Sequence, residues 1–315
     1  MTDTAELQAA LAPIAAGRAT ARLAGNRADV VLDVTGLPET ARSELEADVR
    51  TAAAAIAGVD EVRVLQTSER TARRLIAVAS GKGGVGKSTV AANLAIALKR
   101  SSVRVGLVDA DIYGPSQPKL LGAEGVRPQA RDEKLIPIET PHGVPLLSTG
   151  ALVPEGQAIA WRGPMAGGAL GQLIDAHWGD VDTLILDLPP GTGDVQLTMV
   201  QKHKPAGAVI VSTPQDLALI DATRAIDLFR RVDVPVIGLI ENMAGYQCPH
   251  CGELSDPFGR GGAEAAAAAL GIPFLGRIPL ELEIRTASDS GNAAEAPAFG
   301  EIAAKLQDWL NQAKG

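Results

Sequence analysis

A glycine-rich segment constrains the fold of this chain more than any other part of its sequence. An apolar run at 75–79 precedes it, and the stretch 90–98 that follows has the composition of a helix. A loop of pattern G-x-x-x-x-G-K-[ST] between a strand and a helix turns its backbone N–H groups toward a phosphate. We therefore predict a nucleotide-binding loop rather than a turn that binds nothing. Its residues are Gly81, Lys82, Gly83, Gly84, Val85, Gly86, Lys87, Ser88 and Thr89.

Two lysines of this loop are candidate catalytic residues. Lys87 is expected to neutralise the β- and γ-phosphates, and the Ser88 hydroxyl is expected to bind Mg²⁺. Lys82 directly follows the first glycine, where an ordinary phosphate loop needs no cation. Its stem is expected to point away from its own phosphates, which would let it reach the nucleotide of a facing subunit. The alternative is a surface lysine without a role.

The composition argues against several classes of protein. The 315-residue chain carries a formal net charge of −8, whereas a general nucleic-acid binder normally displays a basic face. No apolar run approaches the ~20 residues of a membrane span, and the first residues lack the basic and apolar regions of a secretory signal. The chain has two cysteines, which fits a reducing compartment. We expect a cytoplasmic protein without nucleic-acid or membrane partners.

The sequence divides into three parts. A small α/β domain is expected at 1–66, a polar linker at 67–74 and a P-loop ATPase domain at 75–315. In the small domain, alternating apolar residues indicate strands, and an Ala- and Glu-rich stretch indicates a helix. These elements are a strand at 28–34, a helix from Pro38 to about Ala57 and a strand at 59–65.

From residue 75 onward the pattern is that of a parallel α/β fold. Runs rich in Val, Ile and Leu alternate with helical stretches, and such runs suit strands that are buried on both faces. We predict a mostly parallel sheet with helices on both faces, whose ligands collect at the carboxyl ends of the strands. The strands are expected at 75–79, 103–108, 144–148, 183–187, 207–212, 235–240 and 273–278.

Polar residues stand where several of these strands end. Asp109 and Asp111 leave the second strand together, and we expect Asp111 to position or deprotonate the attacking water and Asp109 to help hold Mg²⁺. Asp187 ends an apolar strand, an arrangement that holds Mg²⁺ through a water, and the loop 189–193 behind it suits a γ-phosphate switch. Asn242 closes a later strand and offers both a donor and an acceptor to a purine edge, although a turn-forming role is equally consistent. Together with the phosphate loop, these residues favour hydrolysis over passive binding.

The two cysteines, Cys248 and Cys251, have C-x-x-C spacing. Two thiolates at this spacing can hold one soft metal, but they supply only half of a tetrahedral sulfur set. Two copies meeting at a two-fold axis would provide four thiolates, enough for a [4Fe–4S] cluster or a zinc ion. A redox dithiol should open a helix, whereas Gly252 and the pair Asp256-Pro257 indicate a loop. Metal or cluster binding is therefore favoured over dithiol chemistry and over an idle pair.

These segments carry two family resemblances. The phosphate loop with its second lysine resembles the deviant Walker A loop of the MinD, ParA, ArsA and nitrogenase iron protein superfamily, whose nucleotide-sandwich dimers use this lysine in trans. Over residues 74–312 the chain is similar to the Mrp/ApbC family of iron–sulfur cluster carrier ATPases. The matching segments are 81–89, 109–116, 161–165, 178–180, 187–194, 212–216, 241–243 and 248–251.

The Mrp/ApbC resemblance implies a homodimer that binds ATP and hydrolyses it slowly. It also implies a labile [4Fe–4S] cluster that bridges the subunits and passes to apo-proteins. The small domain at 1–66 is similar to the iron–sulfur assembly domain found in many members. It lacks the cysteine that such a domain often carries, so a docking or vestigial role is expected. The residues that the resemblance assigns are Lys82 as the trans-acting lysine, Lys87, Ser88 and Thr89 as ligands of phosphate and Mg²⁺, and Cys248 and Cys251 as cluster ligands.

A different class of function stays open at this point. MinD- and ParA-like relatives use an ATP-dependent dimer to hold a membrane or DNA, and the last helix of this chain is amphipathic. Its polar side is not basic, although basic residues are what an anionic lipid surface favours. We therefore expect this helix to pack on the core of its own domain. Its apolar residues are Ile302, Leu306, Trp309 and Leu310.

Overall fold

The structure is a computed structural model that describes residues 4–35, 37, 39–67, 73–152, 162–294 and 296–312. The chain divides into two compact units, Met1–Ala72 and Arg73–Gly315. Among the described residues, no helix combines the length and the apolar character needed to cross a membrane. Some expectations fall outside the described residues, namely Pro38 as the start of a helix, Trp161 in the family resemblance and positions 68–72 of the linker.

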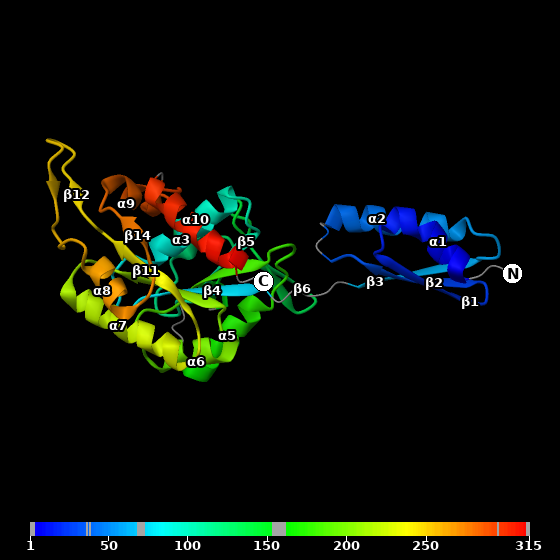
Figure 1. Ribbon diagram of the computed structural model, residues 1–315, viewed down its shortest axis with the longest axis horizontal. Helices are drawn as coiled ribbons and strands as arrows, with labels where there is room; N and C mark the ends of the chain where they lie inside the picture. Colours follow the sequence, from blue (N-terminus) through cyan, green and yellow to red (C-terminus); the bar gives the residue numbers. More distant parts are fainter. Residues whose placement is uncertain are drawn as a thin grey trace. The chain divides into compact units, whose positions relative to one another are not determined.

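The first unit is a three-stranded sheet with two helices packed on one face (Figure 1). Strand β1 pairs antiparallel with β2, and β2 pairs parallel with β3. Burial alternates along β2, whose Ala28, Val30 and Leu32 pack with Leu7 and Leu11 of the first helix. The elements are α1 Thr4–Ala15, β1 Ala19–Ala24, β2 Arg27–Asp33, α2 Glu39–Ala54 and β3 Glu61–Thr67.

Two elements of this unit are absent from the sequence prediction. The expected strand, helix and strand are present as β2, α2 and β3, but α1 and β1 were not predicted. Strand β1 is rich in alanine, and Ala19 and Ala21 fill its buried positions. Alanine is depleted in strands and gives little apolar contrast, so the two-residue period is weak there.

The second unit contains a seven-stranded sheet in the order β14-β11-β10-β4-β9-β5-β8, and every pairing in it is parallel. The predicted α/β fold with a parallel sheet is confirmed. The strands of the sheet are β4 Arg74–Ala79, β5 Val105–Asp109, β8 Leu146–Ser148, β9 Thr183–Asp187, β10 Gly207–Ser212, β11 Val236–Asn242 and β14 Phe274–Ile278. Short two-stranded pairs are formed by β6 Gln129–Arg131 with β7 Lys134–Ile136, and by β12 Tyr246–Gln247 with β13 Leu254–Ser255.

Helices cover both faces of the large sheet, and each face has its own core. Along β4, Ile76 and Val78 point into the core under α3, α9 and α10, whereas Leu75 and Ala77 point into the core under α5, α6, α7 and α8. Burial on both faces explains why the strand reads as a continuous apolar run. The helices are α3 Lys87–Arg100, α4 Gln117–Leu120, α5 Gly163–Ile174, α6 Asp194–His203, α7 Asp216–Arg231, α8 Gly262–Leu270, α9 Leu282–Asp289 and α10 Pro297–Gln312, with a 3₁₀ turn at Thr149–Leu152.

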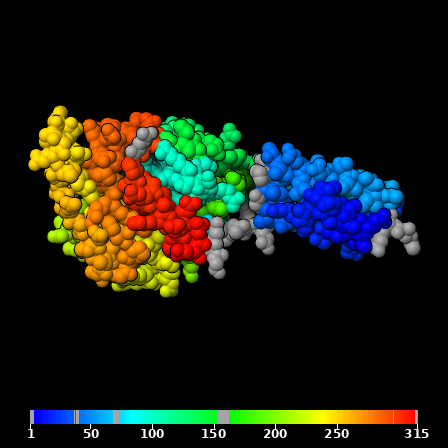
Figure 2. All heavy atoms as spheres, turned by 45° about the horizontal axis from the view of Figure 1, so that its top comes forward, coloured from blue at the N-terminus to red at the C-terminus, as the bar shows by residue number. Residues whose placement is uncertain are grey.

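The last helix packs on its own domain. Helix α10 lies against α3 and β14, and Figure 2 shows it as a red band across the surface of this unit. Its Ile302, Leu306 and Leu310 are buried, and Trp309 packs on the same core. The apolar side of α10 is therefore part of the core, as the sequence predicts.

Candidate functional site

The glycine-rich loop joins the end of β4 to the start of α3, as the sequence predicts. A cavity of about 220 Å³ opens in front of it. A larger cavity of about 370 Å³ lies between α3 and α10, and its lining contains none of the predicted site residues. The smaller cavity therefore marks the candidate phosphate site. It is lined by Ser80, Lys82, Gly83, Gly84, Gly86, Lys87, Ser88, Thr89, Asp111 and Pro190.

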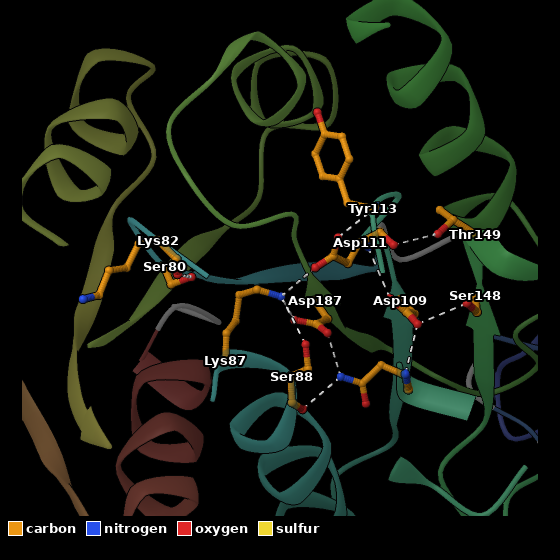
Figure 3. Close-up of polar contacts among 11 residues, drawn as sticks. Ser80, Lys82, Lys87, Ser88, Asp109, Asp111, Tyr113, Ser148, Thr149 and Asp187 are labelled. Atoms are coloured by element: carbon orange, nitrogen blue, oxygen red, sulfur yellow. Dashed lines mark hydrogen bonds and ion pairs between the residues drawn. The ribbon is translucent and has the colours of Figure 1, made fainter. Parts of the chain in front are cut away.

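Lys87 lines this cavity and contacts two carboxylates, Asp111 and Asp187, which we call the carboxylate nest (Figure 3). Its side chain is 6% exposed, and its Nζ forms an ion pair with Asp187 Oδ1. The same Nζ lies 3.7 Å from Asp111 Oδ2 and 3.3 Å from Ser88 Oγ. The carboxyl ends of β5 and β9 bring both aspartates to the loop, because these neighbouring parallel strands end at the same edge. To bind an anion in the cavity, Lys87 would have to give up its contacts with Asp187 and Asp111.

Asp109 lies behind this nest and does not line the cavity. It is fully buried, and its Oδ2 accepts hydrogen bonds from the Gln117 N–H at 3.0 Å and from Ser148 Oγ at 3.1 Å. Burial, reinforced by the nearby Asp187 carboxylate, raises the pKa of Asp109 from 3.8 to about 8. Its expected place in the Mg²⁺ shell stays a prediction, and its position favours an indirect role.

Asp111 keeps access to the cavity. Burial raises the pKa of its carboxyl, and the nearby Lys87 ammonium opposes that shift. Its Oδ1 accepts the backbone N–H of Tyr113 at 3.1 Å, which fixes the turn that follows β5. A carboxylate held in this way faces the space in front of Lys87 and could orient a water there.

Lys82 points away from the carboxylate nest in Figure 3, although it contributes to the rim of the cavity. Ser80 Oγ donates a hydrogen bond to the Lys82 carbonyl oxygen at 2.9 Å, which holds the backbone at this turn. The expectation that Lys82 points away from its own phosphates stays a prediction. Its proposed action on a partner's nucleotide stays a prediction.

Asn242 contacts the back of the phosphate loop. Its Nδ2 donates to the Val85 carbonyl oxygen at 2.8 Å, and the side chain is almost wholly buried. Glycine at position 86 is what allows this close approach, because a Cβ built on it would lie 2.1 Å from that nitrogen. The structure thus gives this amide a loop-bracing role that the sequence did not predict, and the expected contact with a purine stays a prediction.

Gln117 is the main site residue that the sequence analysis missed. It is fully buried at the start of α4, and its Nε2 donates to the Ser88 carbonyl oxygen at 2.9 Å and to Asp187 Oδ2 at 2.7 Å. The one available signal was a polar residue directly after the 109–116 segment. That signal does not say which strands the side chain would join.

Cys248 and Cys251 lie in the turn of the hairpin formed by β12 and β13, which projects from the unit beyond the end of β11 (Figure 1). The Cys248 N–H donates to the Glu253 carbonyl oxygen at 2.9 Å, and the Gly252 N–H donates to the Cys248 carbonyl oxygen at 2.8 Å. Cys248 is partly buried, and Cys251 is exposed. The motif therefore lies in a loop and not at a helix start, which agrees with the expectation against a thioredoxin-like dithiol.

The hairpin prepares Cys248 to act as a thiolate. The backbone N–H of Cys251, followed by that of His250 and by the Cys251 thiol, donates to the Cys248 sulfur and lowers the pKa of its thiol. Thiolate is the form that binds metal. In the part of the chain that the structure describes, no group of three His, Cys, Asp or Glu side chains forms a metal site. The expectation that the two thiols form half of a shared metal site stays a prediction.

A parallel sheet, a phosphate loop at its carboxyl edge and an aspartate at the end of the neighbouring strand define a P-loop NTPase. Comparison with known proteins identifies the group within this class. The chain matches the family described as NUBPL iron-transfer P-loop NTPase (ParA) over residues 71–312, and it belongs to that family. The resemblance to Mrp-type carriers is confirmed.

Individual relatives agree with this assignment. The chain is 53% identical over 222 residues to the iron–sulfur cluster carrier protein of Pseudomonas fragi, which covers 70% of this chain and 77% of that protein. It is 46% identical over 285 residues to the carrier protein of the same description from Deinococcus radiodurans, with coverage of 87% and 81%.

Solved structures share the fold. A nucleotide-binding protein from Archaeoglobus fulgidus, solved in complex with ADP and with Co, has a TM-score of 0.63 and 40% identity, with coverage of 72% of this chain and 90% of that one. MinD from Aquifex aeolicus has a TM-score of 0.55 and 21% identity, with coverage of 75% and 97%. The second likeness shows the fold alone.

Proposed function

We propose that this protein is an ATP-hydrolysing iron–sulfur cluster carrier in which two copies hold a [4Fe–4S] cluster between them and pass it to apo-proteins. The observation that carries the proposal is the position of the thiol pair. Cys248 and Cys251 lie on a hairpin that begins four residues after Asn242, and Asn242 contacts the phosphate loop. The names of the relatives support iron–sulfur cargo over other cargo.

The half-site explains why two copies are needed. Four thiolates are the usual ligand set of a [4Fe–4S] cluster, and one chain supplies two. A two-fold axis brings the same surface of each copy together, so two hairpin turns meet and complete the set. The exposed hairpin makes such a meeting sterically simple. Cargo held between subunits is also easier to release than cargo enclosed within one chain.

The nucleotide site has the ligands that Mg²⁺ prefers. This ion takes oxygen ligands, keeps several waters and is usually held by one or two carboxylates plus phosphates. The Ser88 hydroxyl and the Asp187 carboxylate both lie beside Lys87 Nζ and form such a donor set. When bound, Mg²⁺ neutralises charge on the phosphates. The residues present therefore fit the ion.

Binding of ATP would rearrange the nest around Lys87. We expect Lys87 Nζ to leave Asp187 and Asp111 for the β- and γ-phosphates, which frees Asp187 to face the metal. The backbone N–H groups of the loop 81–89 would surround the phosphates, with Thr89, which lines the cavity at the first turn of α3, near them. Asp111, released from Lys87, orients the attacking water.

The partner copy would complete the nucleotide site. Lys82 points away from its own Lys87 in Figure 3, so its charge is available to the phosphates of a facing copy. Loop 189–193 follows Asp187, and its Pro190 lines the cavity, so it can respond to the γ-phosphate. These contacts would link ATP turnover to the approach and separation of the two hairpins, and hence to release of the cluster.

A cysteine variant tests the assignment of cargo. Cys248→Ala should lose the iron that anaerobic reconstitution gives the wild type, while ATP binding stays at the wild-type level, because the hairpin contributes nothing to the lining of the phosphate cavity. The matched control is Ser255→Ala in the same hairpin, which should keep its iron. Metal analysis separates iron from zinc. Retention of a full cluster by Cys248→Ala would point to other ligands.

A further inference from the structure

Gln117 joins three parts of the nucleotide site although it does not line the cavity. Its side-chain amide nitrogen donates both to the Ser88 carbonyl oxygen at 2.9 Å and to Asp187 Oδ2 at 2.7 Å. Its backbone N–H donates to Asp109 Oδ2 at 3.0 Å. The phosphate-loop helix and the carboxyl ends of two strands therefore share one buried residue.

The two oxygens of Asp187 have different partners. Oδ1 is paired with Lys87, and Oδ2 accepts the amide of Gln117. Asp187 is fully buried, and the amide on Oδ2 leaves Oδ1 as the oxygen on the side of Lys87, which lines the cavity. If Lys87 moves to the phosphates, Gln117 is the donor that stays on Asp187 among the described contacts. Its contact with Ser88 holds it at the first turn of α3.

The filling of space alone does not account for a glutamine at this position. Gln117 Oε1 is buried without a hydrogen-bond partner among the described residues, and such an atom is unfavourable. An apolar side chain of similar length would fill the same space without that penalty. What the glutamine adds is its donor end, and both bonds of that end go to residues of the nucleotide site.

We propose that Gln117 is a positioning residue for Mg²⁺-dependent nucleotide binding, because its amide holds Asp187 in the orientation that faces the metal once Lys87 has moved to the phosphates. The inference rests on the proposed ATP site. It assigns Gln117 no contact with nucleotide, so its effect should appear in the Mg²⁺ dependence of binding and not in binding itself.

The test compares nucleotide affinity with and without Mg²⁺. Gln117→Met keeps the length of the side chain and removes the donor, and Gln117→Leu serves as a second variant if the first does not fold. The matched control is Gln196→Met on α6, which removes a buried amide that has no hydrogen-bond partner among the described residues. Affinity for a fluorescent ATP analogue is measured in excess EDTA and across a Mg²⁺ titration, with the melting temperature of each variant recorded.

The expected result is specific to the metal. Loss of a hydrogen bond to a charged group should raise the Mg²⁺ concentration for half-maximal tightening about 10- to 100-fold in Gln117→Met. Affinity in EDTA should match that of the wild type, and excess Mg²⁺ should restore tight binding. Gln196→Met should show the wild-type Mg²⁺ dependence.

Two results would overturn the proposal. One is a wild-type Mg²⁺ dependence in a folded Gln117 variant. The other is an equal loss of affinity with and without Mg²⁺, since that would indicate a general disturbance of the loop. Failure of the ATP site itself is distinguishable, because the wild-type protein would then bind no analogue under either condition.

Discussion

Replacing Gly86 by alanine should destabilise the nucleotide-free protein, because the new methyl group would clash with the Asn242 amide behind the phosphate loop. Gly86 has a φ of +80°, and a Cβ added to it would lie 2.1 Å from Asn242 Nδ2. The new methyl group must therefore push the amide away from the Val85 carbonyl oxygen, to which it now donates at 2.8 Å. Backbone strain and the loss of a buried hydrogen bond act together.

The two contributions can be separated in size. An alanine in the left-handed region costs about 1–2 kcal/mol relative to glycine. A buried donor or acceptor left without a partner costs about 1–3 kcal/mol. The expected loss in free energy of unfolding is thus about 2–5 kcal/mol. For a domain of this size each kcal/mol lowers the melting temperature by about 2–4 °C.

Gly84→Ala is the matched control. Gly84 has nearly the same φ, +81°, in the same loop, but a Cβ added there meets nothing within 4 Å. It should therefore show the strain alone, and Gly86→Ala should melt lower by about 2–12 °C. Melting curves of nucleotide-free protein measure the difference.

A double-mutant cycle assigns that difference to Asn242. On an Asn242→Ala background the clash partner is gone, so Gly86→Ala should lose only as much stability as Gly84→Ala does. Equal melting temperatures for Gly84→Ala and Gly86→Ala in the wild-type background would refute the reasoning. So would a Gly86→Ala effect that stays unchanged when Asn242 is removed.

Two further predictions concern the carboxylates and the loop lysine. The pKa of Asp109 is raised to about 8 by burial and by Asp187, so the fold holds this proton more tightly than the unfolded chain does. Its contribution to stability is therefore full below about pH 4 and is lost as pH rises toward about 8. The melting temperature of the wild type minus that of Asp109→Asn should fall over this window, and a pH-independent difference would contradict the assignment. Lys87→Ala should abolish cluster delivery in cells and still hold reconstituted iron. The reason is that Lys87 lies in the phosphate cavity and not in the cysteine hairpin. Loss of bound iron in this variant would show that ligation of the cluster itself needs nucleotide.

The large sheet was predictable because its strands are buried on both faces. Segments such as 183–187 and 207–212 are short and apolar and have a proline two residues beyond an end, and continuous apolar runs of this kind suit strands buried on both faces. The phosphate loop was predictable for a different reason, since its glycines and Lys87 form a pattern with a known mechanism. The alanine-rich β1 lacks both signals, and it was missed.

The hydrogen bonds between the residues of the site were not predictable in the same way. Asp109 and Asp111 are two positions apart on one strand end, yet the structure buries Asp109 and leaves Asp111 at the cavity. Which carboxylate faces the ligand depends on Gln117 and Ser148, which reach Asp109 from other elements. The contact between Asn242 and Val85 likewise depends on how β11 packs beside the loop, which no local pattern records.

Whether two chains share one cluster is tested by counting iron per protein chain after anaerobic reconstitution, on material of known oligomeric state. A shared cluster should give about four iron atoms for every two chains, all in the dimeric fraction, since four thiolates from two hairpins form the ligand set. A monomer that still bound a complete cluster in the presence of nucleotide would contradict it. So would a dimer whose Cys248 and Cys251 pairs lay on opposite outer surfaces.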